Sequence, residues 1–164
     1  MHTSDSPAAL ALCQWLARSA LSVALRGSRF AFPCIETIHL LALAVFGGAV
    51  CAFILHILGV FLPQRAPGDV LHDLKPVISG GLIALLLSGL LLFAAGPLRY
   101  YANAAFRAKL FLIVCGATIG FFTWWTARRQ PAARPASATL TAVAVLTAML
   151  WLGVGVAGRM IGLL

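Results

Sequence analysis

The sequence predicts an all-α integral membrane protein, a bundle of four transmembrane helices preceded by an amphipathic helix at the membrane interface. Of its 164 residues, 62% are hydrophobic and only 10% are charged, whereas a soluble domain carries about 25% charged residues. Residues 37–64 contain no Asp, Glu, Lys or Arg, and about 20 apolar residues are enough to cross a bilayer core of roughly 30 Å. Further apolar runs follow later in the chain, and together they indicate four spans.

Residues 1–34 are predicted to form the interfacial helix and the turn that leads into the membrane. Polar side chains recur there at four-residue intervals, at Gln14, Arg18, Ser22 and Arg26. That spacing places them along one side of a helix over residues 8–26. Because these side chains interrupt the apolar run, we expect the helix to lie in the interface, with Trp15 at the level of the headgroups.

Residues 35–164 are predicted to form the bundle itself. The expected spans are 35–62, 76–98, 110–127 and 137–158, separated by segments rich in proline, glycine or basic residues. Small residues recur at four-residue spacing, at Gly80, Ala84 and Ser88 and at Gly116 and Gly120. Such faces let helices approach closely in lipid, so we expect them to pack within the bundle, against other membrane subunits or against a second copy of the chain.

The excess of positive charge is expected to meet the lipid bilayer and not nucleic acid. The net charge is +8, but the cations flank the apolar runs, at the level of anionic headgroups. Four spans would place both termini on one side of the membrane, called side A here, with Glu36, His39, residues 99–109 and Arg159. The other side, side B, would hold His56, His72 and the basic segment 128–134. Lys and Arg divide almost evenly between the sides, and the dense cluster in 128–134 favours side B as cytoplasmic.

Several classes of activity find no support in the sequence. It contains no H-E-x-x-H, no G-x-S-x-G and no P-loop. With four carboxylates in the whole chain, catalysis by a carboxylate pair is disfavoured. The four cysteines form no C-x-x-C pair, so neither a disulfide framework nor covalently attached haem is predicted.

Two histidines, His39 and His56, are the only ionisable side chains of residues 37–64 apart from cysteine. An ionisable group inside a membrane segment is expensive to keep there and marks a functional site by default. They are separated by 17 residues, which is about 25 Å along a helix. A single metal ion or haem iron therefore cannot bind both, so either they belong to two different sites or one of them is structural.

The first candidate site is on side A. His39 follows Glu36 by one turn, and Lys109 enters the membrane at the same level on the third span, near Tyr100 and Tyr101. A neutral imidazole is a good ligand for haem iron or copper. Cations at this end are suited to pair with haem propionates; they are Arg99, Arg107, Lys109 and Arg159. The alternative is an ion pair between Glu36 and Lys109, with His39 bonded to a neighbouring helix.

The second candidate site is on side B, where His56 and His72 stand at the two ends of one loop. A turn between them would bring both imidazoles onto one metal ion, with Asp69 and Asp73 nearby. No spacing motif supports this pair, so the favoured interpretation is that both histidines contact water and headgroups at the interface.

Short patterns along the chain resemble an uncharacterised family of small bacterial four-helix membrane proteins. They are F-P-C-I-E-T-I-H-L-L-A-L-A at 32–44, S-G-L-L-L-F at 88–93, Y-A-N-A-A-F-R-A-K at 101–109 and W-L-G-V-G-V-A-G-R at 151–159. The layout is similar to that of copper-resistance-D-like membrane proteins and of haem-containing protoporphyrinogen oxidases of the HemJ type. Those oxidases place a histidine early in the first span and a lysine at the start of the third, which would correspond to His39 and Lys109.

The site residues and the resemblance lead to one expected function with two alternatives. We expect a b-type haem protein of the bacterial inner membrane, in electron transfer or haem-linked redox chemistry. His39 would be the axial ligand, Lys109 and Arg159 would neutralise propionates, and Tyr100, Tyr101 and Glu36 would line the pocket. The alternatives are a copper-binding or copper-transport protein, with His39 or the pair His56 and His72 as ligands, and a non-catalytic subunit of a larger membrane complex. Whether the protein is an enzyme is left open by the sequence.

Overall fold

The computed structural model describes residues 7–129 and 137–161, and every regular element in that part of the chain is a helix. The helices are α1 (Pro7–Ala17), α2 (Ala20–Gly27), α3 (Ala31–Ile57), α4 (Pro67–Ala95), α5 (Pro97–Ala102), α6 (Ala104–Arg128) and α7 (Ala138–Ile161). The all-α prediction is confirmed.

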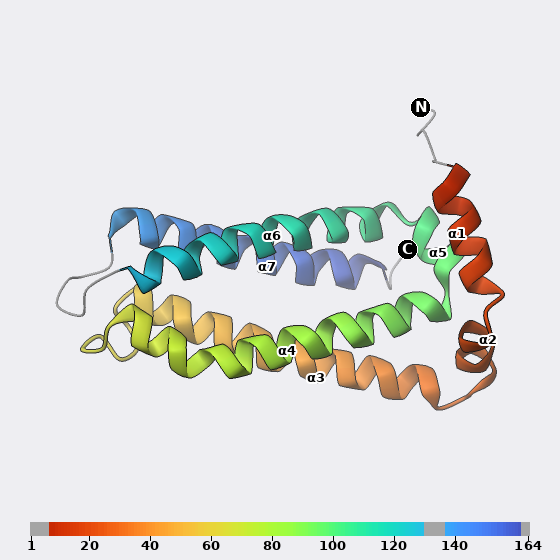
Figure 1. Ribbon diagram of the computed structural model, residues 1–164, viewed down its shortest axis with the longest axis horizontal. Coiled ribbons are helices and arrows are strands. Elements are labelled where there is room, and N and C mark those ends of the chain that lie inside the picture. Colours follow the sequence, from red (N-terminus) through yellow and green to blue (C-terminus); the bar gives the residue numbers. More distant parts are fainter. Residues whose placement is uncertain (1–6, 130–136, 162–164) are drawn as a thin grey trace.

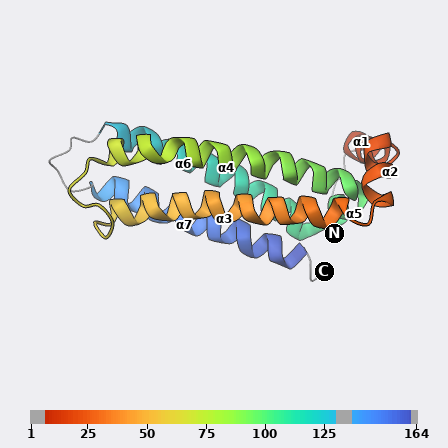
Figure 2. The same ribbon diagram turned by 90° about the horizontal axis from the view of Figure 1, so that it is seen from below.

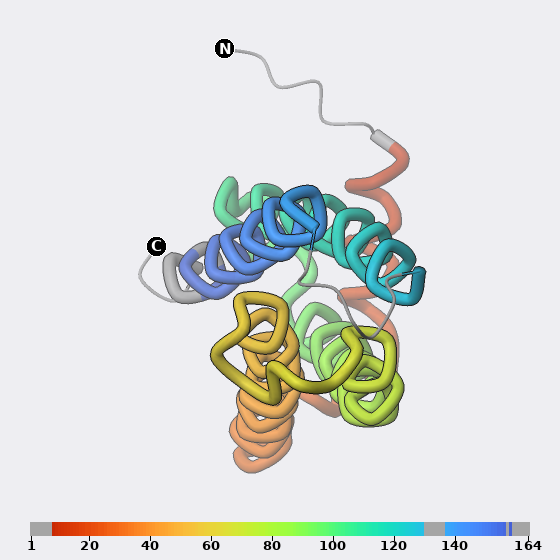
Figure 3. Tube along the Cα trace, turned by 90° about the vertical axis from the view of Figure 1, so that its left-hand side faces the viewer, coloured from red at the N-terminus to blue at the C-terminus, as the bar shows by residue number. Residues whose placement is uncertain are grey.

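Four of these helices are long and apolar enough to cross a bilayer: α3, α4, α6 and residues Ala138–Val156 of α7. The protein is therefore a multi-pass membrane protein. The four helices run lengthwise in two antiparallel hairpins, α3 with α4 and α6 with α7 (Figures 1 and 2). The short helices α1, α2 and α5 gather at the side-A end (Figure 1). Seen end-on, the two hairpins lie against each other as separate pairs (Figure 3).

The densest packing between the hairpins is near side B. A cluster of buried apolar side chains there draws on all four long helices: Phe53, Ile54, Ile57, Val70, Leu71, Ala127, Leu140 and Ala144. The hydroxyls of Thr123 and Thr147 add a hydrogen bond of 3.0 Å between α6 and α7. Large apolar side chains such as Leu87 and Leu152 cover the outside of the bundle, as expected of helices that face lipid.

Glycines set the close approach of the helices, at positions that differ in part from the expected stripe. On α4, a Cβ added at Gly81 would lie 3.0–3.2 Å from the Cβ, Cα and N of Phe46 on α3, whereas one at Gly80 would meet nothing within 4 Å. The face of α4 in contact with α3 therefore runs through Gly81 and Ser88, and Gly80 points away from it. Gly116 and Gly120 do pack on α7, against Trp151 and Thr147.

The N-terminal segment is two helices where one continuous helix was predicted. α1 and α2 meet at an angle of 56°. The Ser19 side chain accepts a hydrogen bond of 3.2 Å from the Ser22 N–H, and this N-cap starts a new helix because a serine cap satisfies an otherwise free backbone N–H. The pair is apolar enough to form a broken span, and its place in the membrane interface stays a prediction.

The observed boundaries of the long helices differ from the predicted boundaries of the spans. α3 ends at Ile57, because Gly59 takes a left-handed conformation with φ of +76°. α4 begins at Pro67, where proline fits the first turn of a helix, and it continues through Pro76.

α6 begins at Ala104, because the side chain of Asn103 accepts hydrogen bonds from two N–H groups of the first turn. Lys109 consequently lies inside α6 and not at its start.

Candidate functional site

The side-A site is built on a contact between α3 and α4. The half-buried imidazole of His39 and the buried hydroxyl of Ser88 are joined by a hydrogen bond of 2.8 Å between Nδ1 and Oγ. Two turns separate His39 from Phe46, the residue that packs on Gly81. The close approach of the two helices at Gly81 thus brings Ser88 within reach of His39.

The direction of this hydrogen bond follows from the protons that are available. Ser88 has one hydroxyl proton, and its Oγ lies 2.6 Å from the carbonyl oxygen of Ala84, to which it donates. The Ser88 oxygen then accepts from His39, so we assign the proton of the neutral ring to Nδ1. The backbone of Leu85 is also close enough to hydrogen-bond the imidazole. The lone pair of the ring is therefore on Nε2, the nitrogen that a metal would bind.

The remaining two long helices place a cation near the imidazole and a glycine beside that cation. Lys109 of α6 is close enough to His39 for the two side chains to interact electrostatically. Its Nζ lies 3.4 Å from the place that a Cβ on Gly158 of α7 would occupy. On α4, a Cβ on Gly89 would lie 3.4 Å from Cε1 of His39, the ring carbon between the two nitrogens. Two glycines thus lie beside the two candidate side chains, one against His39 and one against Lys109.

Aromatic rings form one wall at the side-A end. Phe93 stacks on Phe106 with ring centroids 5.4 Å apart, and Tyr100 lies 5.5 Å from Phe106. Burial raises the pKa of the Tyr100 phenol, the positive charge of Arg99 lowers it, and the negative charge of Glu36 raises it. The structure therefore places Glu36 near Tyr100. Tyr101, on the same short helix, is half-buried.

A pocket of about 290 Å³ lies beside Tyr100 and carries two guanidinium groups, which come from Arg26 of α2 and Arg99 of α5. The Arg26 guanidinium also donates to the carbonyl oxygen of Ala17, at 2.5 Å. Arg26 was not among the predicted site residues, because the sequence does not show that α2 packs against α4 and so brings Arg26 to the same pocket as Arg99. Ser88 was missed for a related reason: it was assigned to helix packing, and only the register of α4 against α3 makes it the partner of His39.

The other predicted side-A contacts have different outcomes. No ion pair between Glu36 and Lys109 is found among the residues that the structure describes. The alternative in which His39 bonds a neighbouring helix does hold, through Ser88. Arg159, the fourth expected cation, has a side chain outside the described part of the chain.

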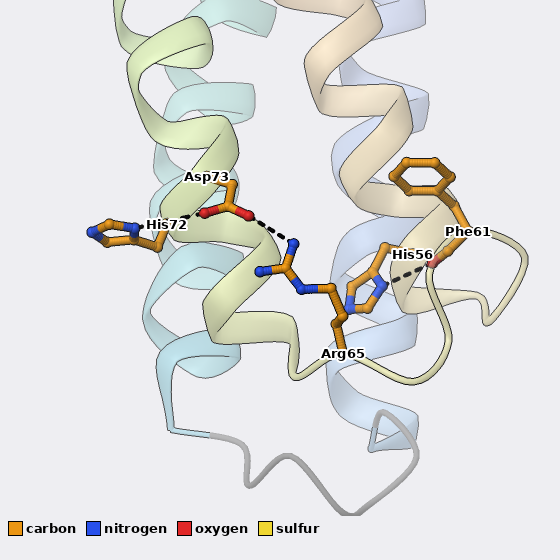
Figure 4. Close-up of polar contacts among 5 residues, drawn as sticks. All are labelled: His56, Phe61, Arg65, His72 and Asp73. Atoms are coloured by element: carbon orange, nitrogen blue, oxygen red, sulfur yellow. Dashed lines mark hydrogen bonds and ion pairs between the residues drawn. The ribbon is translucent and has the colours of Figure 1, made fainter.

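The structure does not bring the two side-B histidines together (Figure 4). His56 is buried, and its Nδ1 lies 2.9 Å from the carbonyl oxygen of Phe61, so it closes the turn after α3. His72 is 88% exposed and lies 3.9 Å from a carboxylate oxygen of Asp73. Asp73 is engaged in turn by Arg65, at 2.7 Å. Figure 4 shows the two imidazoles pointing away from each other on opposite sides of this ion pair.

Conventional metal ligands do not cluster in the part of the chain that the structure describes. Within residues 7–129 and 137–161, no three side chains of the His, Cys, Asp and Glu types lie close enough to share one ion. The side-A arrangement therefore supplies one neutral imidazole with a free Nε2, a cation beside it and an aromatic wall. That set suits a metal cofactor whose metal takes one axial ligand from the protein and whose other coordinating atoms belong to the cofactor itself.

Comparison with known proteins gives one match. The model of a family of unknown function (DUF6644) matches residues 23–164. No curated protein and no solved structure matches the chain.

Proposed function

We propose that this chain, which belongs to the DUF6644 family of unknown function, is a membrane b-type haem protein that acts in electron transfer or haem-linked redox chemistry. The observation that carries the proposal is the hydrogen bond between His39 Nδ1 and Ser88 Oγ, in which we assign the proton to Nδ1. A histidine that ligates a metal almost always donates its other ring N–H to a neighbouring acceptor, which fixes the tautomer and the orientation of the ring. His39 has this arrangement inside a membrane span.

The residues around His39 fit a haem group. Haem iron takes one imidazole nitrogen as its axial protein ligand, and Nε2 of His39 meets this need. Gly89 lies beside the edge of the ring that carries Cε1, so that no side chain of this residue stands between the ring and a bound group. Lys109, beside His39, would hold a propionate through a charge-assisted hydrogen bond. The rings of Phe93 and Phe106 are suited to exclude water on the side-A end.

A bound haem would supply one-electron chemistry, and the chain would set its environment. Ser88 would keep the His39 ring oriented and raise the basicity of Nε2. The ammonium of Lys109 would lower the cost of keeping a propionate at membrane level. Arg159 is a second candidate for this role, and Tyr100 and Tyr101 are candidates for the pocket wall.

The proposal is tested by the spectrum of the purified full-length protein. We expect it to carry haem with a Soret band, and we expect His39→Ala to lose the band while circular dichroism shows intact helices. His56→Ala is the matched control, because His56 is a histidine of the same helix whose Nδ1 bonds a turn carbonyl. Loss of the band in His56→Ala with retention in His39→Ala would overturn the assignment.

Copper binding is the first alternative, and the structure favours it less. Copper sites draw on several histidine, cysteine or methionine ligands. In the described part of the chain, no group of three His, Cys, Asp or Glu side chains gathers around one point. Copper bound at one equivalent and lost in His39→Ala, in protein that takes up no haem, would favour this alternative.

A non-catalytic role as a subunit of a larger complex is the second alternative. It is favoured by small residues on outward faces: a Cβ at Gly47, Gly48, Gly80 or Gly155 would meet nothing within 4 Å. Such faces admit another helix, from a partner or from a second copy of the chain. A colourless, metal-free protein that copurifies with one stoichiometric membrane partner would support this role.

We also propose a place and an orientation for the protein. It would lie in the cytoplasmic membrane of a bacterium with side B toward the cytoplasm. Arg128 and Arg129 support this orientation, since both lie at the side-B end of α6 and cytoplasmic ends of spans are enriched in Lys and Arg. Reporter fusions after Gly59 and after Asn103 should then show opposite sides, with Gly59 inside.

A further inference from the structure

An apolar cavity of about 480 Å³ lies between the two hairpins. All four long helices contribute to its wall, with Phe46 from α3, Leu82 from α4, Gly116 and Trp124 from α6, and Trp151 from α7. The cavity is distinct from the His39 site, because Phe46, its lining residue on α3 that is nearest to His39 in sequence, lies two turns further along the helix.

The depth of the cavity corresponds to one leaflet of a bilayer. On α4 its lining runs from Leu71, near side B, to Leu82, which is about 16 Å at 1.5 Å per residue. On α6 it runs from Trp124 to Gly116, about 12 Å by the same rise. Half of the hydrocarbon core is about 15 Å thick. The cavity therefore extends from the side-B boundary to the middle of the membrane, the depth that an acyl chain of one leaflet occupies.

The mouth of the cavity is positively charged. Lys75 lines it, and the guanidinium of Arg128 lies 4.5 Å above the ring of Trp124, another lining residue. Of the two aspartates on the first turns of α4, Asp73 is already paired with Arg65, at 2.7 Å. Asp69 is the remaining carboxylate at this end of α4. An apolar interior below a cationic mouth suits an amphiphile with an anionic headgroup.

We propose that this cavity binds one anionic phospholipid from the leaflet on side B, with an acyl chain between the hairpins and the headgroup phosphate paired with Lys75. Two tryptophans report on the two ends of the site, Trp124 near the mouth and Trp151 at the inner end. The proposal does not depend on haem, because none of the residues that carry it belongs to the His39 site.

Quenching of tryptophan fluorescence by brominated lipids tests the proposal. The full-length protein is reconstituted into phosphatidylcholine vesicles, and a small fraction of phosphatidylglycerol with bromine at mid-chain is titrated in. We expect saturable quenching that brominated phosphatidylcholine at the same fraction does not produce. Trp151→Phe should remove most of the saturable part, since its ring is the one at the depth of the bromines. Equal quenching by the two lipids would overturn the proposal.

Substitutions at the mouth separate a specific site from general attraction to the surface. Lys75→Gln should raise the fraction of phosphatidylglycerol at half-saturation about tenfold, the scale of one lost charge-assisted hydrogen bond, and Lys75→Arg should largely restore it. Arg129→Gln is the matched control: its guanidinium lies over Trp125, which does not line the cavity, and it should change little. Equal effects of Lys75→Gln and Arg129→Gln would overturn the site.

Filling the cavity gives a second, independent variant. Ala117 lines the cavity, and Ala117→Phe should abolish saturable quenching in protein whose helices remain intact by circular dichroism. If a neutral isoprenoid quinone displaces brominated phosphatidylglycerol and binds more tightly than that lipid, the natural occupant is the quinone and the proposal fails.

Discussion

The Nδ1 of His39 and the Oγ of Ser88 lie 2.8 Å apart across the α3–α4 interface, and this contact fixes what the imidazole can do. With the Ser88 hydroxyl donating to the carbonyl of Ala84, we assign the ring proton to Nδ1, and Nε2 is left as the acceptor or ligand. A histidine with a purely structural role, which holds two helices together, would need only this hydrogen bond. The free Nε2 and the neighbouring Lys109 are what give the contact a further use.

Ser88→Ala tests the role of the orienting bond. Without the acceptor, His39 loses the fixed tautomer, and we expect haem affinity to fall roughly tenfold, the lower end of the range for partners of metal ligands. Titration of the apoprotein with haem measures this. Ser79→Ala is the control, since its hydroxyl bonds only its own helix. Equal affinities in the two variants would contradict the role given to Ser88.

Lys109→Ala tests the cation. The loss of one charge-assisted hydrogen bond to a propionate should lower haem affinity about ten- to a hundredfold, and the Soret maximum should stay where it is because the axial ligand is unchanged. Lys75→Ala, a lysine at the other end of the bundle, should leave the affinity unaltered. A shift of the Soret maximum in Lys109→Ala would show that lysine acts on the iron and not on a propionate.

Gly81→Ala tests the close approach of α3 and α4. Its Cβ would lie 3.0 Å from the Cβ of Phe46, so we expect a loss of about 1–3 kcal/mol in the free energy of unfolding, the cost of overpacking. Gly80→Ala provides the matched control, because open space surrounds that position and alanine is the better helix former. Thermal unfolding in detergent compares the two, and similar stabilities would refute the packing assigned to Gly81.

The ionisation of Tyr100 gives a prediction on pH. Burial, the main cause, raises its pKa above 10.0, so the folded protein holds this proton to higher pH than the unfolded chain does. Stability is therefore unaffected below pH 10.0 and falls as the pH rises beyond it, because the unfolded state loses the proton first. The ultraviolet titration of tyrosinate should lose a transition above pH 10 in Tyr100→Phe. Loss of a transition at lower pH would contradict the burial of the phenol.

The sequence predicts the helical class and the four spans because long apolar runs have few other solutions in a membrane. The predicted helix boundaries are wrong where a side-chain cap sets them. The cap at Ser19 divides a segment that the periodicity predicts as one helix, and Asn103 starts α6 ahead of Lys109. His39 could be selected as a candidate from the sequence, because it is an imidazole in an apolar run. The hydrogen bond between His39 and Ser88 could not be inferred, because it depends on which face of α4 packs on α3. Gly80 and Gly81 are adjacent, and the sequence does not show which of them faces α3.

The central claim is that Nε2 of His39 ligates haem iron, and chemical rescue of His39→Gly tests it most directly. Removing the imidazole leaves a space that free imidazole can enter from solution. The account predicts that His39→Gly shows no haem spectrum, that added imidazole restores the Soret band saturably, and that His56→Gly needs no imidazole. A wild-type Soret band in His39→Gly without imidazole would contradict the claim.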